Sequence, residues 1–287
     1  MPSLSAEEAT TIRAVRIALA QLDATLGDVE ANEVRVRETL ARVDADLVVF
    51  PELYLSGYAL AAVEADTTRT ADEVAGLVPE GSAALVGFHE RGRRNSAAYV
   101  REGQVVHVQR KLALVDYPPF DEHHVFEPGD ELHAFDTPEA RLATLICNDA
   151  WQPSLVGLAA EDGAEVLLMP ACSSTVVPEA EQIWRDLTRL YARLLGCHVV
   201  FVNRVGREPG FTFWGGSHVV APDGEVIAEA PRFEEALVTA AVEPARRLTS
   251  LPRNRFNSLK SVGSSGKTAF RASHSRPDVV VRSTQGG

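Results

Sequence analysis

Apolar runs of strand length recur along the chain and are separated by segments with helical spacing. A continuous apolar run predicts a strand that is covered on both faces, and an alternating run predicts a strand with one buried face. The predicted strands occupy residues 14–21, 47–50, 83–89, 142–146, 166–169, 199–203, 218–221, 225–229 and 236–242. Two further runs, 96–101 and 104–109, flank Glu102-Gly103, and this two-residue turn predicts a β-hairpin.

Other segments carry apolar residues at the spacing of a helix. Asp28 can cap a helix in which Val36, Leu40 and Val43 share one face. Further helices are predicted at 71–78, at 154–162, where Gly163 ends the helix, and at 179–195. The last of these is the most amphipathic, because four apolar residues form one stripe along it: Ile183, Leu187, Leu190 and Leu194.

The order of these elements predicts the class of fold. Strands alternate with helices at both ends of the pattern, and antiparallel hairpins lie between them. This order predicts an α/β protein with a mixed sheet, not a purely parallel one. After Pro244 the pattern weakens, and residues 261–287 are rich in Ser, Gly and Arg, so this tail is predicted to have no core of its own.

Composition and charge restrict the partners and the environment. The 287 residues, 45% of them hydrophobic and 24% charged, are typical of one or two soluble globular domains. The formal net charge of −12 argues against nucleic acid or a membrane as the main partner. The most apolar window, 47–63, contains Glu52 and is too short to span a bilayer. The three cysteines cannot all pair within the chain and no signal peptide is visible, so we expect a cytoplasmic protein.

Three reactive side chains follow directly on predicted strands: Glu52, Lys111 and Cys147. Ligands of α/β proteins bind beyond the carboxyl ends of strands, so these side chains could share one crevice. A free cysteine has a pKa of about 8.5 and is mostly protonated at neutral pH, so its attack on a carbonyl needs a base, for which Glu52 is the candidate. The resulting oxyanion needs a donor fixed in place, which Lys111 and a backbone N–H could supply.

Two other interpretations use histidine. The loop at 117–129 is predicted to form a lid or pocket wall, and within it Asp121-Glu122-His123-His124 could suggest a metal site. We expect the adjacent histidine side chains to diverge, and no second ligand cluster has metal spacing, so no metal is predicted. His198 or His218 could serve as the base of a thiol–histidine hydrolase, but both lie in apolar runs, where a structural histidine is favoured.

The motifs around these residues resemble the carbon–nitrogen hydrolase (nitrilase) superfamily, whose hallmark is a Glu-Lys-Cys triad. The resemblance rests on an ordered series of short motifs between about residues 12 and 242, each weak alone. They are Ala20-Gln21, Asn32, the segment 46–52, Gly57-Tyr58, Gly87-Phe88, Asn95-Ser96, Arg110-Lys111, Phe126-Glu127-Pro128-Gly129, Ile146-Cys147-Asn148-Asp149, Asn203-Arg204-Val205-Gly206, Gly215-Gly216-Ser217 and Pro222-Asp223-Gly224.

The resemblance implies a role for five residues. Glu52 would be the general base, Lys111 the oxyanion stabiliser and Cys147 the nucleophile. The backbone N–H of Asn148 would be a second oxyanion donor, and Glu122 a further carboxylate that orients the substrate and the lysine. No cofactor is implied, and the substrate would be a small amide. Six residues are candidates for the substrate pocket: Tyr58, Tyr117, Phe120, Trp151, Cys172 and Ser173.

The resemblance also implies an architecture, a four-layer α-β-β-α sandwich with two mixed sheets. The carbon–nitrogen hydrolase domain would occupy residues 1–245, and residues 246–287 would form a partly flexible extension and a candidate dimer contact. Members of the family pair through helical faces into homodimers or larger homo-oligomers. The apolar stripe of the helix at 179–195 is either such a face or packs internally.

The motifs favour amide hydrolysis without selecting the acyl group. Asn148-Asp149 replaces the Trp-Glu of true nitrilases and favours an amidase. Carbamoyl-amide hydrolases share Cys-Asn-Asp, but Ala150-Trp151 stands where their basic pair is expected. The loop at 117–126 resembles that of the glutaminase domains of NAD synthetases, although no synthetase domain follows in this sequence. From a different class, a catalytically idle binding or assembly module is the second hypothesis.

Overall fold

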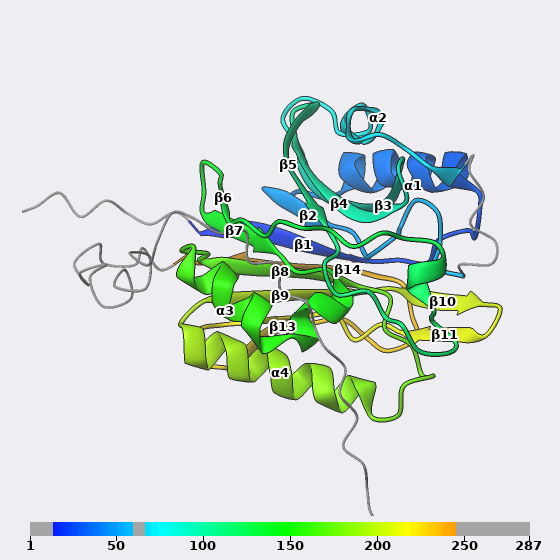
Figure 1. Ribbon diagram of the computed structural model, residues 1–287. Helices are drawn as coiled ribbons and strands as arrows, with labels where there is room; N and C mark the ends of the chain where they lie inside the picture. The colour runs from blue at the N-terminus through cyan, green and yellow to red at the C-terminus, as the bar shows by residue number, and fades with distance from the viewer. Residues whose placement is uncertain (1–13, 60–66, 245–287) are drawn as a thin grey trace, which may run out of the picture. The chain divides into compact units, whose positions relative to one another are not determined.

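The structure is a computed structural model that describes residues 14–59 and 67–244 (Figure 1). The chain divides into two units, residues 1–247 and 248–287, and the second lies outside the described residues. The predicted extension at 246–287, with its flexibility and its dimer contact, therefore stays a prediction. None of the helices in the described ranges is long and apolar enough to cross a membrane.

Two six-stranded sheets dominate the described residues. The first has the order β14 (Ala236–Val242), β1 (Val15–Gln21), β2 (Leu47–Val49), β3 (Ala83–Glu90), β4 (Arg94–Arg101) and β5 (Gln104–Arg110). The second has the order β13 (Val226–Glu229), β12 (His218–Val220), β9 (His198–Asn203), β8 (Val166–Ala171), β7 (Arg141–Thr144) and β6 (Phe135–Asp136). Strands β1, β2 and β3 are parallel, as are β7, β8 and β9, and the other pairs are antiparallel. The predicted mixed sheets are confirmed.

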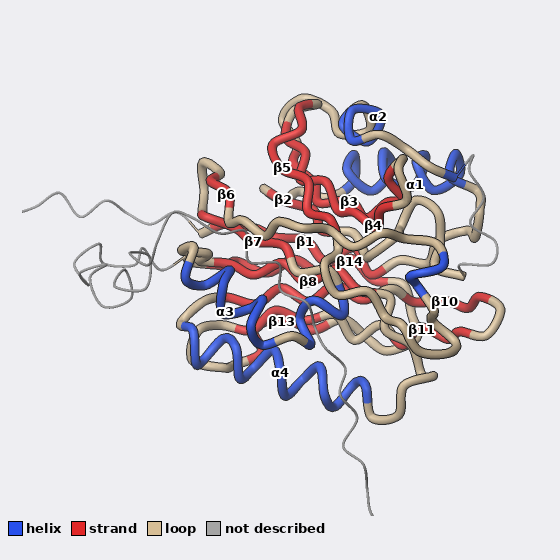
Figure 2. Tube along the Cα trace, in the orientation of Figure 1, coloured by secondary structure: helices blue, strands red, loops and turns tan. Residues whose placement is uncertain are grey.

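Helices cover the outer face of each sheet, so the molecule has four layers (Figures 1 and 2). Helices α1 (Val29–Arg42) and α2 (Ala71–Ala75) lie on the first sheet, and α3 (Pro153–Glu161) and α4 (Ala180–Leu195) lie on the second. Successive residues of a strand point to opposite faces. Ile17 and Leu19 accordingly join the core between the sheets, while Ala18 and Ala20 pack toward the helices. The predicted α-β-β-α sandwich is confirmed.

Local chemistry accounts for the ends of several elements. Asp28 caps α1, because its side chain accepts a hydrogen bond from the backbone N–H of Ala31 at 3.0 Å. Glu102 and Gly103 both have positive φ in the turn between β4 and β5, which is the geometry of a two-residue hairpin turn. Gly163, with φ of +94°, follows the end of α3. These predictions are confirmed.

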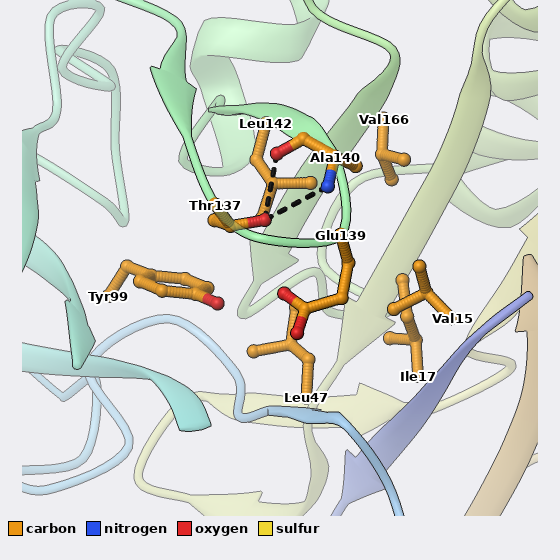
Figure 3. A pocket seen from close by; sticks show the side chains of 9 residues that line it. All are labelled: Val15, Ile17, Leu47, Tyr99, Thr137, Glu139, Ala140, Leu142 and Val166. Carbon is orange, nitrogen blue, oxygen red and sulfur yellow. Dashed lines mark hydrogen bonds between the residues drawn. The ribbon is translucent and has the colours of Figure 1, made fainter. Parts of the chain in front are cut away.

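The contact between the sheets closes over a small apolar cavity at the amino ends of β1, β2, β7 and β8. Figure 3 shows side chains of both sheets around it, among them Ile17, Leu47, Tyr99 and Leu142. The turn between β6 and β7 covers the cavity, held by the hydroxyl of Thr137, which donates to the carbonyl of Ala140 at 2.7 Å. Most of the side chains around this cavity are apolar, and Glu52, Lys111 and Cys147 follow the opposite ends of the strands.

Only part of the apolar stripe of α4 packs on the sheet: Leu187 is half-buried against the core there. The buried residues of this helix are Ala180, Trp184, Thr188, Tyr191 and Ala192. Leu190 and Leu194 are 54% and 72% exposed. The large rings of Trp184 and Tyr191 fill the space over the second sheet, and Leu190 and Leu194 face outward. The stripe therefore packs internally in part, through Leu187, and its role as a face for a second subunit stays a prediction.

The two-residue strand β6 and one whole hairpin are absent from the sequence-based prediction. Strands β10 (Val205–Glu208) and β11 (Phe211–Trp214) pair antiparallel as a two-stranded unit beyond the end of β9. Polar residues and Pro209-Gly210 interrupt the apolar pattern here, so the segment lacks a run long enough to predict a strand.

Gly87 of β3 provides a test of this packing, because a Cβ at this position would lie 2.6 Å from the backbone nitrogen of Leu53 and closer still to the carbonyl oxygen of Pro51. We expect Gly87→Ala to lower the free energy of unfolding by about 1–3 kcal/mol, since the segment that carries Glu52 must move. Gly157→Ala is the matched control: nothing lies within 4 Å of a Cβ there, so helix propensity should stabilise it by up to about 1 kcal/mol. Urea unfolding of both variants measures the difference, and equal effects would contradict the close approach.

Candidate active site

A buried lysine joins two carboxylates at one end of the sandwich. The Nζ atom of Lys111 donates to Oε1 of Glu52 and to Oε1 of Glu122, each at 2.7 Å. All three side chains are fully shielded from solvent. Glu52 comes just after β2, and Lys111 directly follows β5 of the same sheet. Two residues of the predicted triad and the predicted further carboxylate therefore meet in one cluster.

Glu52 is held by hydrogen bonds to both of its carboxylate oxygens. The side-chain amide of Asn95 donates to Oε1 at 2.8 Å, and the backbone N–H of Cys172 donates to Oε2 at 2.9 Å. Cys172 lies just beyond β8, so this contact connects the two sheets. Its thiol also donates to the backbone carbonyl oxygen of Glu52, at 3.0 Å. Donors from both sheets thus fix the orientation of the carboxylate.

Glu122 is held in the same way by a second set of donors. Beside Lys111, the hydroxyl of Tyr58 donates to its Oε1 at 2.7 Å and the backbone N–H of Val115 donates to its Oε2 at 3.0 Å. Glu122 begins a short 3₁₀ turn, Glu122–His124, in the loop that follows Lys111. The predicted pocket residue Tyr58 is therefore part of the polar cluster through its hydroxyl.

The pKa of Lys111 is set by opposing effects. Burial alone would lower the pKa of its ammonium, but the negative charges of Glu122 and Glu52 outweigh this and raise the pKa well above its usual value. The lysine is therefore a permanent cation at neutral pH. Such a group can stabilise a developing negative charge but cannot serve as a base.

Cys147 lies within electrostatic reach of this cluster, at the end of β7 in the second sheet. Burial raises the pKa of its thiol well above the usual value; the charge of Glu52 raises the pKa further and that of Lys111 opposes the shift. Cys147 has a positive φ of 46° and begins the 3₁₀ helix Cys147–Trp151. Positive φ is costly for a residue with a side chain, and such strain clusters at functional sites.

Asn148 and Asp149 connect this turn to the segment after Lys111. The side-chain amide of Asn148 donates to the carbonyl of Ala113 at 3.1 Å, and the carboxylate of Asp149 accepts from the backbone N–H groups of Leu112 and Ala113. The first N–H groups of a helix have no partner within it. The position of Asn148 is thus compatible with an oxyanion donor, a role that stays a prediction.

The remaining pocket candidates separate into two groups. Phe120 packs with Tyr58 in an aromatic cluster that also contains Phe211 and Phe213 of the β10–β11 hairpin. Tyr117 is half exposed beside Phe120. Burial is the largest cause that raises the pKa of its phenol, and the charge of Cys147 is the next largest. Tyr58 and Tyr117 of this cluster lie within electrostatic reach of the Cys147 thiol.

Trp151 and Ser173 lie on the other side, in the packing between the second sheet and its helices. The ring of Trp151 lies 6.0 Å from that of Trp184, edge to face. The hydroxyl of Ser173 accepts from the indole N–H groups of Trp184 and Trp214, at 3.1 and 3.2 Å. Both Trp151 and Ser173 therefore contact Trp184.

A second buried ion pair binds the backbone at Tyr58. Glu208 of β10 accepts hydrogen bonds from the backbone N–H groups of Tyr58 and Ala59 and pairs with Arg204. Arg204 is fully buried and also donates to Asp23 at 2.9 Å. The motif Asn203-Arg204-Val205-Gly206 is visible in the sequence. Its connection with Tyr58 depends on Glu208, which belongs to the β10–β11 hairpin that the sequence did not predict.

The structure also shows the surroundings of the four histidines considered as metal ligands or as a catalytic base. The ring centroids of His123 and His124 lie 4.1 Å apart, so the expectation that they diverge was wrong. With Asp121 they bring three possible ligand atoms within 4.8 Å of one another, on a largely exposed turn. Thr188 and the carbonyl of Gly216 occupy both ring nitrogens of His218, and burial lowers its pKa to about 4. His198 begins β9, at the end of the parallel strands opposite to Cys147.

This sandwich, with its Glu-Lys-Glu cluster beside a strand-end cysteine, is the architecture of the nitrilase fold. The family model for carbon-nitrogen hydrolases matches residues 16–248, and the chain belongs to this family.

Three known proteins illustrate the likeness. The glutamine-dependent NAD(+) synthetase of Thermotoga maritima is 31% identical over 85% of this chain and 45% of its own length. The structure of the corresponding synthetase from Acinetobacter baumannii is 27% identical, with a TM-score of 0.73, over 80% of this chain and 45% of that one. An amidase from Nesterenkonia sp. is 25% identical, with a TM-score of 0.74, over 89% of this chain and 98% of that one. The chain thus spans about half the length of the synthetases.

The raised pKa of the Cys147 thiol predicts how the site reacts with an alkylating agent. We expect iodoacetamide to modify Cys147 slowly at neutral pH and faster as the pH rises, because the thiolate is the nucleophile. Intact-mass spectrometry measures the rate, and Cys147→Ala identifies the site, since Cys172 and Cys197 are buried. Rapid labelling that does not change between pH 6 and pH 9 would show that the thiol is not held in its neutral form.

Proposed function

We propose that the protein hydrolyses the carbon–nitrogen bond of a small, non-peptide amide through a thioester on Cys147. The observation that carries this proposal is the buried ammonium of Lys111, held between Glu52 and Glu122 beside the thiol. A buried cation that remains charged, next to a nucleophile that remains neutral, suits a reaction in which negative charge develops only in the transition state.

The reaction would proceed in two halves. Glu52 takes the proton of Cys147 as the sulfur attacks the carbonyl carbon, and Lys111 with the N–H of Asn148 stabilises the oxyanion. Glu52 returns the proton to the leaving nitrogen, the carbon–nitrogen bond breaks, and ammonia or an amine departs. Glu52 then takes a proton from water, which attacks the thioester. The carboxylic acid leaves, and the sulfur regains its proton.

The acyl group has three candidate classes. The amidase from Nesterenkonia sp., matched over nearly its whole length, supports a simple amide. The likeness to glutamine-dependent synthetases and the loop at 117–126 support a glutaminase-like amidase as the alternative. An N-carbamoyl amide is the third, from the shared Cys147-Asn148-Asp149. The outward leucines of α4, Leu190 and Leu194, support a homodimer.

Release of ammonia from a panel of aliphatic amides, glutamine and N-carbamoyl compounds tests the function directly. We expect release from at least one class by the wild-type protein and none by Cys147→Ala. Mass spectrometry of Cys147 during turnover should detect the trapped acyl group and so identify the substrate. If no compound is hydrolysed and no acyl group forms, the binding or assembly module becomes the better explanation.

Lys111→Arg tests the oxyanion role separately from the positive charge. The guanidinium keeps the charge but is larger and planar, so it does not reproduce the position of Nζ between Glu52 and Glu122. We expect kcat to fall by about 100-fold or more, the typical loss when an oxyanion donor is displaced. Circular dichroism checks the fold, and near-normal kcat in a folded variant would refute this assignment.

A further inference from the structure

We propose that Asp149 is a positioning residue that sets the distance between Lys111 and Cys147. Its Oδ1 accepts hydrogen bonds from the backbone N–H groups of Leu112 and Ala113, at 3.0 and 2.7 Å. Its Oδ2 accepts from the backbone N–H of Ile146 at 3.0 Å. One carboxylate thus joins the residues that directly follow the lysine to the residue that directly precedes the cysteine. This inference rests on the proposed function.

The connection matters because the two groups belong to different sheets. Lys111 follows β5 of the first sheet, and Cys147 follows β7 of the second. The sheets meet mainly through apolar side chains, as in the contact that Figure 3 shows, and apolar packing is non-directional. A displacement of about 1 Å between reacting groups can cost a factor of about 100 in rate. Directional bonds between the two segments would hold this distance.

A second side chain, that of Asn148, strengthens the connection between the two segments. The N–H of Ala113 is bound by Asp149, and the carbonyl of Ala113 is bound by the side-chain amide of Asn148 at 3.1 Å. The backbone of Asp149 also closes the turn, since its N–H donates to the carbonyl of Ile146 at 3.0 Å. The side chains of Asn148 and Asp149 therefore bind both the carbonyl and the N–H of Ala113. This gives a structural reason for the Asn-Asp pair in the motif.

Stability alone does not explain a carboxylate here. Asp149 is completely buried, and burial raises its pKa to about 7, against the hydrogen bond from Ala113 and the charge of Lys111. An acid with a raised folded-state pKa binds protons more tightly when the protein is folded, so stability declines as the pH rises toward that pKa. Above this pH the ionised group is a cost to folding, and its contribution is the geometry that it imposes.

Asp149→Asn is the decisive variant, because the side-chain oxygen can still accept from Leu112 and Ala113 while the new amide group faces the N–H of Ile146. We expect kcat to fall at least about tenfold and KM to change less than about threefold. Asp162→Asn is the matched control: Asp162 accepts from the backbone N–H of Ala134 at 2.8 Å and pairs with Arg141, outside the site, so kcat should stay unchanged.

A pH profile separates positioning from a purely structural role. The charged group that acts on Asp149 is Lys111, and Lys111 in turn faces Glu122, Glu52 and Cys147; all four remain in the variant. We expect the wild-type kcat to decline as the pH falls through about 7, and Asp149→Asn to shift this limb, because asparagine does not titrate. A wild-type kcat and an unchanged profile in the variant would overturn the proposal.

The rate of alkylation of Cys147 keeps this test independent of the proposed function. If the wild type hydrolyses no amide, the function fails, but Asp149→Asn should still change the pH dependence of alkylation, because the thiol moves relative to Lys111. Unchanged alkylation would overturn the positioning role. If Asp149→Asn does not fold, Asp149→Glu decides instead: it keeps the carboxylate but moves it by one methylene relative to the N–H groups of Leu112, Ala113 and Ile146. We expect a loss of kcat from it as well, and no loss would reject the proposal.

Discussion

The arrangement of the site depends on one interaction, the ammonium of Lys111 enclosed between Glu52 and Glu122. Removing such charges from water costs several kcal/mol for each ion, and their attraction offsets this only when the remaining hydrogen-bonding positions are filled. Here Asn95, Tyr58 and backbone N–H groups fill them. Removal of Lys111 would leave two buried carboxylates without a counter-charge, so both carboxylates depend on the lysine.

The sandwich makes this enclosure possible because its strands end together. Lys111 and the carboxylates come from the first sheet and the loops around it, and Cys147 comes from the second. At the site, the polar contacts between the two sides include the N–H of Cys172 on Glu52 and the contacts of Asn148 and Asp149 with the lysine segment. The β10–β11 hairpin adds Glu208, which holds the backbone of Tyr58.

Prediction from the sequence succeeded where the signal was local and strong. The central strands of both sheets, the cap at Asp28 and the turn at Glu102-Gly103 depend on neighbouring residues, and these were found. It failed where two patterns competed. In α4 the leucines are more regular than Trp184 and Tyr191, yet the larger rings took the buried side. The β10–β11 hairpin has no long apolar run, because its residues pack on the site and not in a central sheet.

The sequence alone determined most of the elements, their order, and the presence of a carboxylate, an amine and a thiol after three strands, because these features depend on short stretches of chain. The tertiary structure decided which groups touch. The bond from Cys172 to Glu52 joins residues 120 positions apart, and no local pattern encodes it. The same is true of the contacts of Asp149 and Glu208, since the direction of a hydrogen bond depends on how two sheets pack and not on the spacing of residues within either one.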